Sequence, residues 1–207
     1  MGKRRTIPLT GRNTATQVPV KFTPERRRTR MSKFDTFLDD VFKPRVPTKQ
    51  RPSEISRIKR LLTTIEPRDY YIIGYGSLMN DRSMKKSFDG KKSFPARVKN
   101  WARAFNIPSK VNDERTVLNV FPNEGMNLNV VITKVDFEAV SEFMLREWKY
   151  SIVEVFNEHL TDMKGNPLIL ESPALMVVGR EEHALGTADP IMEYVQTCIH
   201  GCASYSE

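Results

Sequence analysis

The sequence has no apolar run that could cross a membrane. None approaches the roughly 18 uninterrupted apolar residues that a membrane helix needs. The N-terminus is basic but lacks an apolar segment, so no secretory signal is predicted. The only two cysteines, Cys198 and Cys202, exclude a disulfide framework and indicate a reducing compartment. These absences predict a soluble, cytoplasmic protein without a membrane span.

Histidine is also scarce, with three residues, and Cys198, His200 and Cys202 form a cluster that combines both residue types within five positions. On a helix the two cysteines share a face, whereas His200 points roughly 200° away from Cys198. No second ligand pair completes a tetrahedral site. We therefore predict no metal site, and we interpret the cysteines as small core residues of a docked helix.

The net charge of +8 is divided unevenly along the 207 residues. Residues 1–33 carry +9, residues 34–115 carry +8, and residues 116–207 carry −9. A uniformly basic domain that coats nucleic acid is therefore not indicated. The basic excess belongs to the N-terminal part, where an acidic protein or a nucleic acid is the partner class that residues 1–33 would suit.

The N-terminal part, residues 1–52, is predicted to be a basic arm. Residues 1–33 contain few large apolar side chains, so they are expected to be disordered or to depend on a partner for order, and a solvated tail is the simplest interpretation. Helical spacing of phenylalanines predicts a short amphipathic helix at 32–43, and three prolines predict a linker at 44–52. A second amphipathic helix is expected within 53–68, leading into the domain.

Residues 69–207 alternate short β-rich runs with two helical patterns. This texture predicts an α+β domain, with a small mixed β-barrel or sheet and helices packed against it. A turn is expected at 122–125, and an irregular or helical connection at 79–88. The expected strands are 70–76, 95–105, 116–122, 128–135, 150–156 and 173–179, and the expected helices are 136–148, capped by Asp136, and 189–202, with Pro190 in its first turn.

The stretch Gly74-Tyr75-Gly76-Ser77 stops the first strand abruptly. A phosphate loop is excluded because no Lys-Ser/Thr follows, and a serine nucleophile elbow is excluded because Tyr75 and Met79 replace its two glycines. Two interpretations remain open. The glycines either bring backbone N–H groups close to an anion or carbonyl, or they form a tight turn without a ligand.

Several motifs, in order, resemble the γ-glutamylcyclotransferase-like superfamily. Tyr75-Gly76-Ser77-Leu78 resembles the family's Y-G-S loop after its first strand. The remaining motifs cover much of residues 69–207: an aromatic-ended strand at 101–105, a strand closing on a Pro turn at 118–125, a further strand at 128–135, the segment 143–155 that resembles the family's catalytic helix end, and the late P-x-x-x-Y helix at 190–203.

The resemblance implies that Glu147 is the catalytic carboxylate of an enzyme that releases 5-oxoproline from a γ-glutamyl amine or peptide. It also implies that Tyr75, Gly76, Ser77 and Leu78 bind the substrate, with Tyr194 near the site, and that no metal or organic cofactor is needed. The residues themselves leave two interpretations of Glu147 open. It ends a helix between aromatic side chains that could desolvate it, or it is an exposed helix glutamate.

Two departures from the family pattern support an alternative function. Trp148 stands where the family often has Gly after the catalytic Glu, and Asn129 replaces another family Gly. The alternative is a catalytically inactive domain of this fold that serves in an assembly, or with nucleic acid, through its basic arm. The two hypotheses differ structurally: an enzyme needs Glu147 to face an open pocket beside residues 76–78, whereas a scaffold can have that pocket filled by Trp148 or by its own N-terminal arm.

Overall fold

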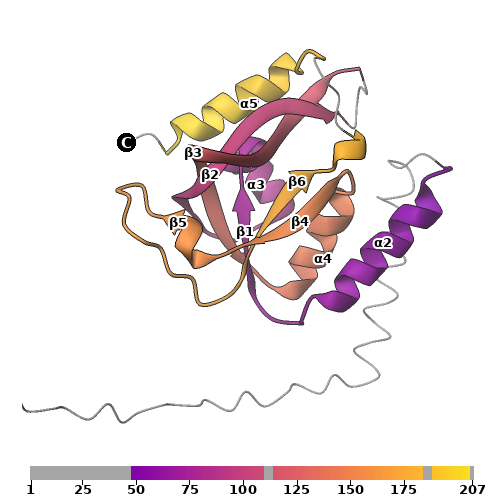
Figure 1. Cartoon of the computed structure of the whole chain (residues 1–207), viewed down its shortest axis with the longest axis horizontal. Helices are drawn as coiled ribbons and strands as arrows, with labels where there is room; N and C mark the ends of the chain where they lie inside the picture. Colours follow the sequence, from indigo (N-terminus) through magenta and orange to yellow (C-terminus); the bar gives the residue numbers. More distant parts are fainter. Residues whose placement is uncertain (1–47, 110–113, 184–187, 206–207) are drawn as a thin grey trace, which may run out of the picture. The chain divides into compact units, whose positions relative to one another are not determined.

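The computed structural model describes residues 48–109, 114–183 and 188–205, and in these ranges it shows the predicted α+β fold (Figure 1). The predicted arm at 1–33 and the helix at 32–43 lie outside the described residues. No helix within the described ranges is both long and apolar enough to span a membrane. The strands are β1 (Tyr70–Gly74), β2 (Ser93–Pro108), β3 (Thr116–Val135), β4 (Tyr150–Val155), β5 (Leu160–Thr161) and β6 (Ala174–Gly179), and the α helices are α2 (Arg51–Thr64), α3 (Asp81–Ser87), α4 (Phe137–Arg146) and α5 (Met192–Ala203).

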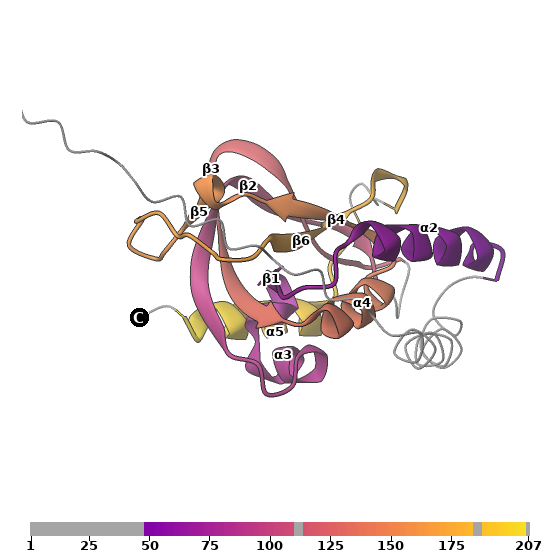
Figure 2. The same cartoon turned by 90° about the horizontal axis from the view of Figure 1, so that it is seen from below.

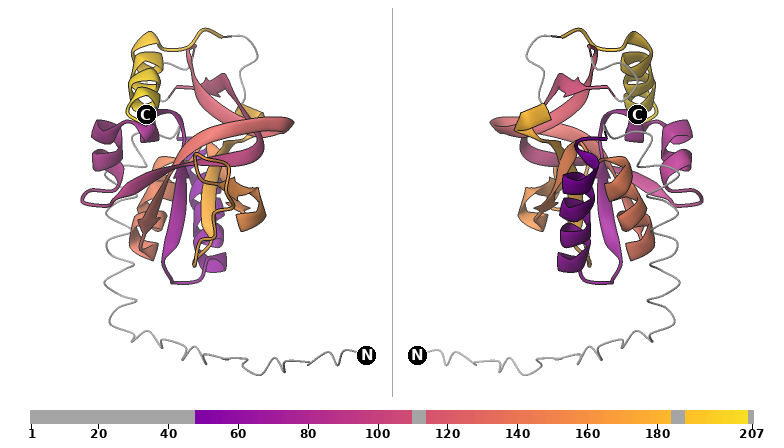
Figure 3. Two further views of the ribbon diagram at one scale, coloured as in Figure 1. Left: turned by 90° about the vertical axis from the view of Figure 1, so that its left-hand side faces the viewer. Right: turned by 90° about the vertical axis from the view of Figure 1, so that its right-hand side faces the viewer.

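The six strands form one mixed sheet in the order β4-β6-β1-β3-β2-β5. Strand β1 pairs antiparallel with β3 and parallel with β6, so it lies inside the sheet. Its Ile72 and Ile73 are fully buried, as expected for a run of β-branched and aromatic residues. Figure 3 shows the long strands β2 and β3 bending strongly.

The turn predicted at 122–125 was wrong, because β3 is one continuous strand of 20 residues. Its Pro122 pairs in register with Trp101 of β2, in a part of β3 away from its pairing with β1. The register shifts here, because Lys99 pairs with Asn127 and Trp101 with Pro122, so that residues 123–126 of β3 lie opposite Asn100 alone. Asn100 has φ 63°, and its side chain accepts a hydrogen bond from Gly125 N (3.1 Å). A β-bulge thus bends the strands at the place where turn-forming residues suggested a reversal.

Figure 2 shows α3, α4 and α5 on the same side of the strands, with α2 beside α4. Helix α4 begins as predicted, because Asp136 accepts a hydrogen bond from Ala139 N (2.9 Å), and it ends at Arg146, two residues early. The second N-terminal helix is also confirmed, although α2 begins at Arg51 inside the predicted linker, with Pro52 in its first turn. Pro190 does not open α5 as expected, since it forms a bridge with Thr116 instead.

Helix α5 packs against the single-turn 3₁₀ helix η2 (Gly76–Met79) that follows β1. The close approach occurs at Gly201, which is buried within α5. A Cβ atom there would lie 2.7 Å from the backbone N of Asn80 and from the backbone C of Met79. Since backbone atoms cannot rotate aside, only glycine lets α5 approach this closely.

We predict that Gly201→Ala destabilises the protein, although the same change normally stabilises a helix interior. The gain in helix propensity is about 1 kcal/mol, whereas overpacking costs about 1–3 kcal/mol. The measurement is urea unfolding, with Gln196→Ala, an exposed position of the same helix, as the control. A higher midpoint for Gly201→Ala would contradict the close approach.

Candidate active site

The site begins where the chain leaves β1. Gly76 has φ +61°, a conformation that L side chains rarely adopt, and a Cβ there would lie 3.0 Å from Tyr194 Oη and 3.0 Å from Leu118 Cδ2. The turn therefore needs glycine for two independent reasons. Residues 76–79 then form η2, and the N–H groups of its first two residues, Gly76 and Ser77, have no partner within the 3₁₀ helix itself.

Beside this turn lies a cleft of about 290 Å³. Four of the residues selected from the sequence line it together, namely Ser77, Leu78, Glu147 and Tyr194. They come from η2, from the end of α4 and from α5, segments that are far apart in the sequence. The other described lining residues are Ser83, Lys86, Ser87, Pro108, Ser109, Val117, Arg146, Lys149 and Tyr150.

Glu147 is the C-cap of α4, with φ −96° and ψ 41°. Its side chain is 15% exposed, and its Oε1 accepts a hydrogen bond from Arg146 Nε at 2.7 Å. Arg146 also donates to the hydroxyl of Ser87 on α3. This charge-assisted pair fixes one oxygen of the carboxylate at the wall of the cleft. The sequence did not indicate Arg146 as a partner, because neighbours in a helix normally diverge.

Three tyrosines surround the turn, in different roles. Tyr75 is buried beside the cleft rather than lining it, and its hydroxyl donates to Val177 O at 2.7 Å. Tyr150 lines the cleft and donates to Leu118 O at 3.0 Å. The hydroxyl of Tyr194 is hydrogen-bonded to Ser77. Burial raises the pKa of all three phenols, so each keeps its proton at neutral pH.

The cleft also carries positive charge, which the sequence analysis located no more closely than as a net +8 over residues 34–115. Among the described residues that line it, Lys86, Arg146 and Lys149 carry positive charge and Glu147 carries the one carboxylate. Helix α3 presents Ser83, Lys86 and Ser87 to the cleft, at positions i, i+3 and i+4 of one helix face. That spacing is visible in the sequence, and it could have identified this wall. A site with hydroxyl, ammonium and guanidinium donors suits an anionic or carbonyl-rich ligand.

Trp148 does not fill the cleft. It is 2% exposed, its ring packs edge-on against His183 at a centroid distance of 5.4 Å, and it is not among the described lining residues. The other departure, Asn129, is also outside the cleft and accepts a hydrogen bond from Arg97 Nε (3.2 Å). Neither departure obstructs access to Glu147 in the described part of the chain.

The two cysteines of α5 take part in packing. Cys198 is buried next to the Tyr194 hydroxyl, and burial raises the pKa of its thiol to about 11. Cys202 contacts the sulfur of Met79 at 3.7 Å and accepts from Arg103 Nη1 at 3.6 Å. Within the described ranges no group of three or more His, Cys, Asp or Glu residues could hold a metal ion.

The chain matches no model of a known protein family and no curated protein. It does match several solved structures. An uncharacterized protein from Homo sapiens is 14% identical, with a TM-score of 0.57 over 67% of this chain and 81% of that chain. A structure described as gamma-glutamyl cyclotransferase is 14% identical, with a TM-score of 0.56 over 67% and 80%.

A third match is a yeast γ-glutamyl cyclotransferase described as specific to glutathione. It is 14% identical, with a TM-score of 0.52 over 68% of this chain and 89% of that chain. At this identity the matches concern the fold, since one fold hosts many functions. The chain therefore has the γ-glutamylcyclotransferase-like fold that the order of its sequence motifs resembles.

Proposed function

We propose that the protein is a γ-glutamylcyclotransferase-type enzyme, with Glu147 as its general base and acid. The observation that supports this most directly is that Glu147 and the turn residues Ser77 and Leu78 line the same cleft, while Trp148 lies outside it. An inactive scaffold with a blocked site is not favoured by this arrangement. The fold shared with two structures described as γ-glutamyl cyclotransferases agrees with the proposal.

The proposed reaction is an intramolecular amide exchange. The α-amine of a γ-glutamyl group attacks its own γ-carbonyl carbon, a C–N bond forms to close the five-membered ring, and the original amide C–N bond breaks. The products are 5-oxoproline and a free amine or peptide. Because the nucleophile and the carbonyl belong to one molecule, the amine has a high effective concentration at the carbonyl carbon. The enzyme therefore needs mainly to select the substrate conformer in which the α-amine lies close to the γ-carbonyl.

Proton transfer is the task proposed for Glu147. The nucleophilic nitrogen starts as an ammonium group, so its proton must leave before attack, and the departing nitrogen must gain a proton. One carboxylate between the two nitrogens can perform both transfers. Arg146 Nε donates to Oε1 of Glu147 at 2.7 Å, which holds the carboxylate that we assign to this role at the wall of the cleft.

Charge stabilisation is the task proposed for the turn after β1. The N–H groups of Gly76 and Ser77 and the hydroxyls of Ser77 and Tyr194 would donate to the substrate's carboxylate or to the developing oxyanion, as preorganised dipoles, with Leu78 beside them at the cleft. Tyr75 would anchor the turn to β6 through its hydrogen bond to the carbonyl of Val177. A small γ-glutamyl compound is thus the proposed ligand, and the chemistry requires no cofactor.

We predict that Glu147→Gln lowers the rate of 5-oxoproline release at least about 100-fold, because glutamine keeps the shape but cannot carry the proton. The measurement is 5-oxoproline formation from a panel containing glutathione, a γ-glutamyl amino acid and a γ-glutamyl-lysine isopeptide. Glu138→Gln, an exposed glutamate in the first turn of the same helix, is the matched control and should keep wild-type activity.

Two results would count against the proposal. One is a folded wild-type protein that releases no 5-oxoproline from any member of the panel. The other is equal activity in Glu147→Gln and wild type, which would remove Glu147 from the mechanism.

We further predict that Tyr194→Phe lowers kcat/KM about tenfold, the amount expected for one lost hydrogen bond in the transition state. The hydroxyl contacts Ser77 at the cleft, so its loss affects the donors proposed for the oxyanion. Tyr205→Phe is the control, because Tyr205 lines a different cavity. Equal kcat/KM values for wild type and Tyr194→Phe would exclude the hydroxyl from this role.

A further inference from the structure

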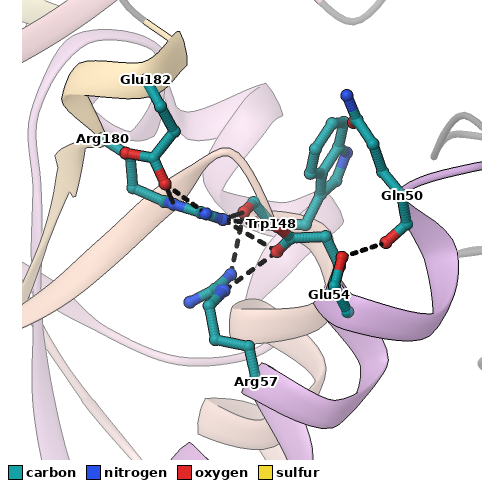
Figure 4. A network of polar contacts seen from close by, with 7 residues as sticks. Gln50, Glu54, Arg57, Trp148, Arg180 and Glu182 are labelled. Atoms are coloured by element: carbon teal, nitrogen blue, oxygen red, sulfur yellow. Dashed lines mark hydrogen bonds and ion pairs between the residues drawn. The ribbon is translucent and has the colours of Figure 1, made fainter.

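A buried ionic cluster lies behind the turn that carries Glu147 (Figure 4). Glu54 of α2 is only 6% exposed. Its two carboxylate oxygens each accept from Arg180 Nη1 at 2.8 Å, and Oε2 also accepts from Arg57 Nε at 2.9 Å. Arg180 Nε donates further to Glu182 Oε1 at 2.7 Å. The cluster joins the N-terminal helix to the segment that follows β6.

Both guanidinium groups of the cluster reach the same backbone carbonyl. Arg57 Nη2 donates to Trp148 O at 2.9 Å, and Arg180 Nη1 lies 3.4 Å from that oxygen. The neighbouring carbonyls are bonded as well, since Glu147 O accepts from Tyr150 N at 2.9 Å and Lys149 O accepts from Arg180 N at 3.3 Å. Three successive carbonyls beyond α4 thus have partners, at a place where a helix end leaves carbonyls without intrahelical bonds.

The turn held in this way supplies Glu147, Lys149 and Tyr150 to the cleft. Glu54, Arg57 and Arg180 themselves are not among the described lining residues. The two arginines bond to the carbonyl of Trp148 instead. Their effect on the cleft must therefore pass through the backbone of residues 147–149.

We propose that Glu54, Arg57 and Arg180 are positioning residues for Glu147, so that α2 forms a functional part of the site. This inference rests on the proposed function of Glu147. Since Glu147 stands just beyond the last helical residue, its side-chain direction follows the backbone of the turn. A misplacement of about 1 Å of a reacting group can cost about 100-fold in rate. Glu54 orients both arginines, and the arginines fix the carbonyl next to Glu147.

The test is the Glu54→Gln variant of the full chain. Glutamine removes the charge that holds the two guanidinium groups together but keeps the side-chain shape. We expect kcat for 5-oxoproline release to fall about tenfold or more, with KM changed by less than about twofold, because no substrate contact is altered. A raised KM with unchanged kcat would overturn a positioning role.

The matched control is Asp136→Ala. Asp136 is the N-cap of α4, at the opposite end of that helix from Glu147. It removes the N-cap bond to Ala139 and the ion pair with Lys91, so it weakens α4 without touching the turn. Measured well below the melting temperatures of both variants, Asp136→Ala should keep kcat within about twofold of wild type. An equal loss of kcat in the two variants would assign the effect of Glu54 to general destabilisation and overturn the proposal.

A second readout does not depend on activity. The chain has two tryptophans, so its ¹H–¹⁵N spectrum contains two indole N–H signals, and Trp101→Phe assigns them. Glu54→Gln should shift the Trp148 signal, and Asp136→Ala should leave it in place. If the wild type released no 5-oxoproline, the proposed enzymatic function would fail, whereas the signal would still decide whether Glu54 positions the turn. An unshifted Trp148 signal would overturn the inference.

Discussion

The left-handed backbone of Gly76 is the constraint on which the cleft depends. It turns the chain out of the buried strand β1, and it leaves room for the Tyr194 hydroxyl, which lies 3.0 Å from the place a Cβ would take. A second glycine, Gly201, lets the same helix α5 approach the end of this turn at Met79 and Asn80. Two positions without side chains therefore allow a helix and a strand end to meet, and the hydroxyls of Ser77 and Tyr194 meet with them.

The opposite wall of the cleft depends on charge rather than on close packing. Glu147 pairs with Arg146 inside the cleft, while Glu54 pairs with Arg57 and Arg180 behind it. Removing one member of such a buried group typically costs about 3–5 kcal/mol, because an unpaired charge remains. Arrangements of this kind tolerate little displacement, which is the property that a proton-transferring carboxylate requires.

Local patterns in the sequence predicted the helices and strands well where one residue type dominates, as in the buried run of β1 and the Asp136 cap of α4. They predicted a turn at 122–125 because Pro and Gly are turn formers, yet β3 continues through that region as one strand, with residues 123–126 bulging opposite Asn100 of β2. The order of motifs indicated the fold and brought Ser77, Leu78, Glu147 and Tyr194 to attention together.

Other features depend on contacts between segments remote in sequence, which no local pattern contains. The inward position of Tyr75 follows from its bond to Val177, 102 residues away. Trp148 is held outside the cleft by its ring contact with His183 and by the bonds from Arg57 and Arg180 to its backbone carbonyl. In the sequence, Arg146 and Lys149 look like ordinary charged residues at a helix end. The fold places them in the wall of the cleft together with residues of α3.

The bond between Glu54 and Arg180 spans 126 residues, and this has a consequence for the order in which the protein matures. During synthesis α2 emerges from the ribosome early, but its buried carboxylate has no Arg180 to pair with until most of the chain has been made. Arg180 directly follows β6, the strand that pairs with β1, so it is made after most of the sheet-forming chain. The turn that bears Glu147 therefore cannot acquire its full set of bonds before residue 180 has been made, so a nascent chain lacks part of the support of this cleft wall until then.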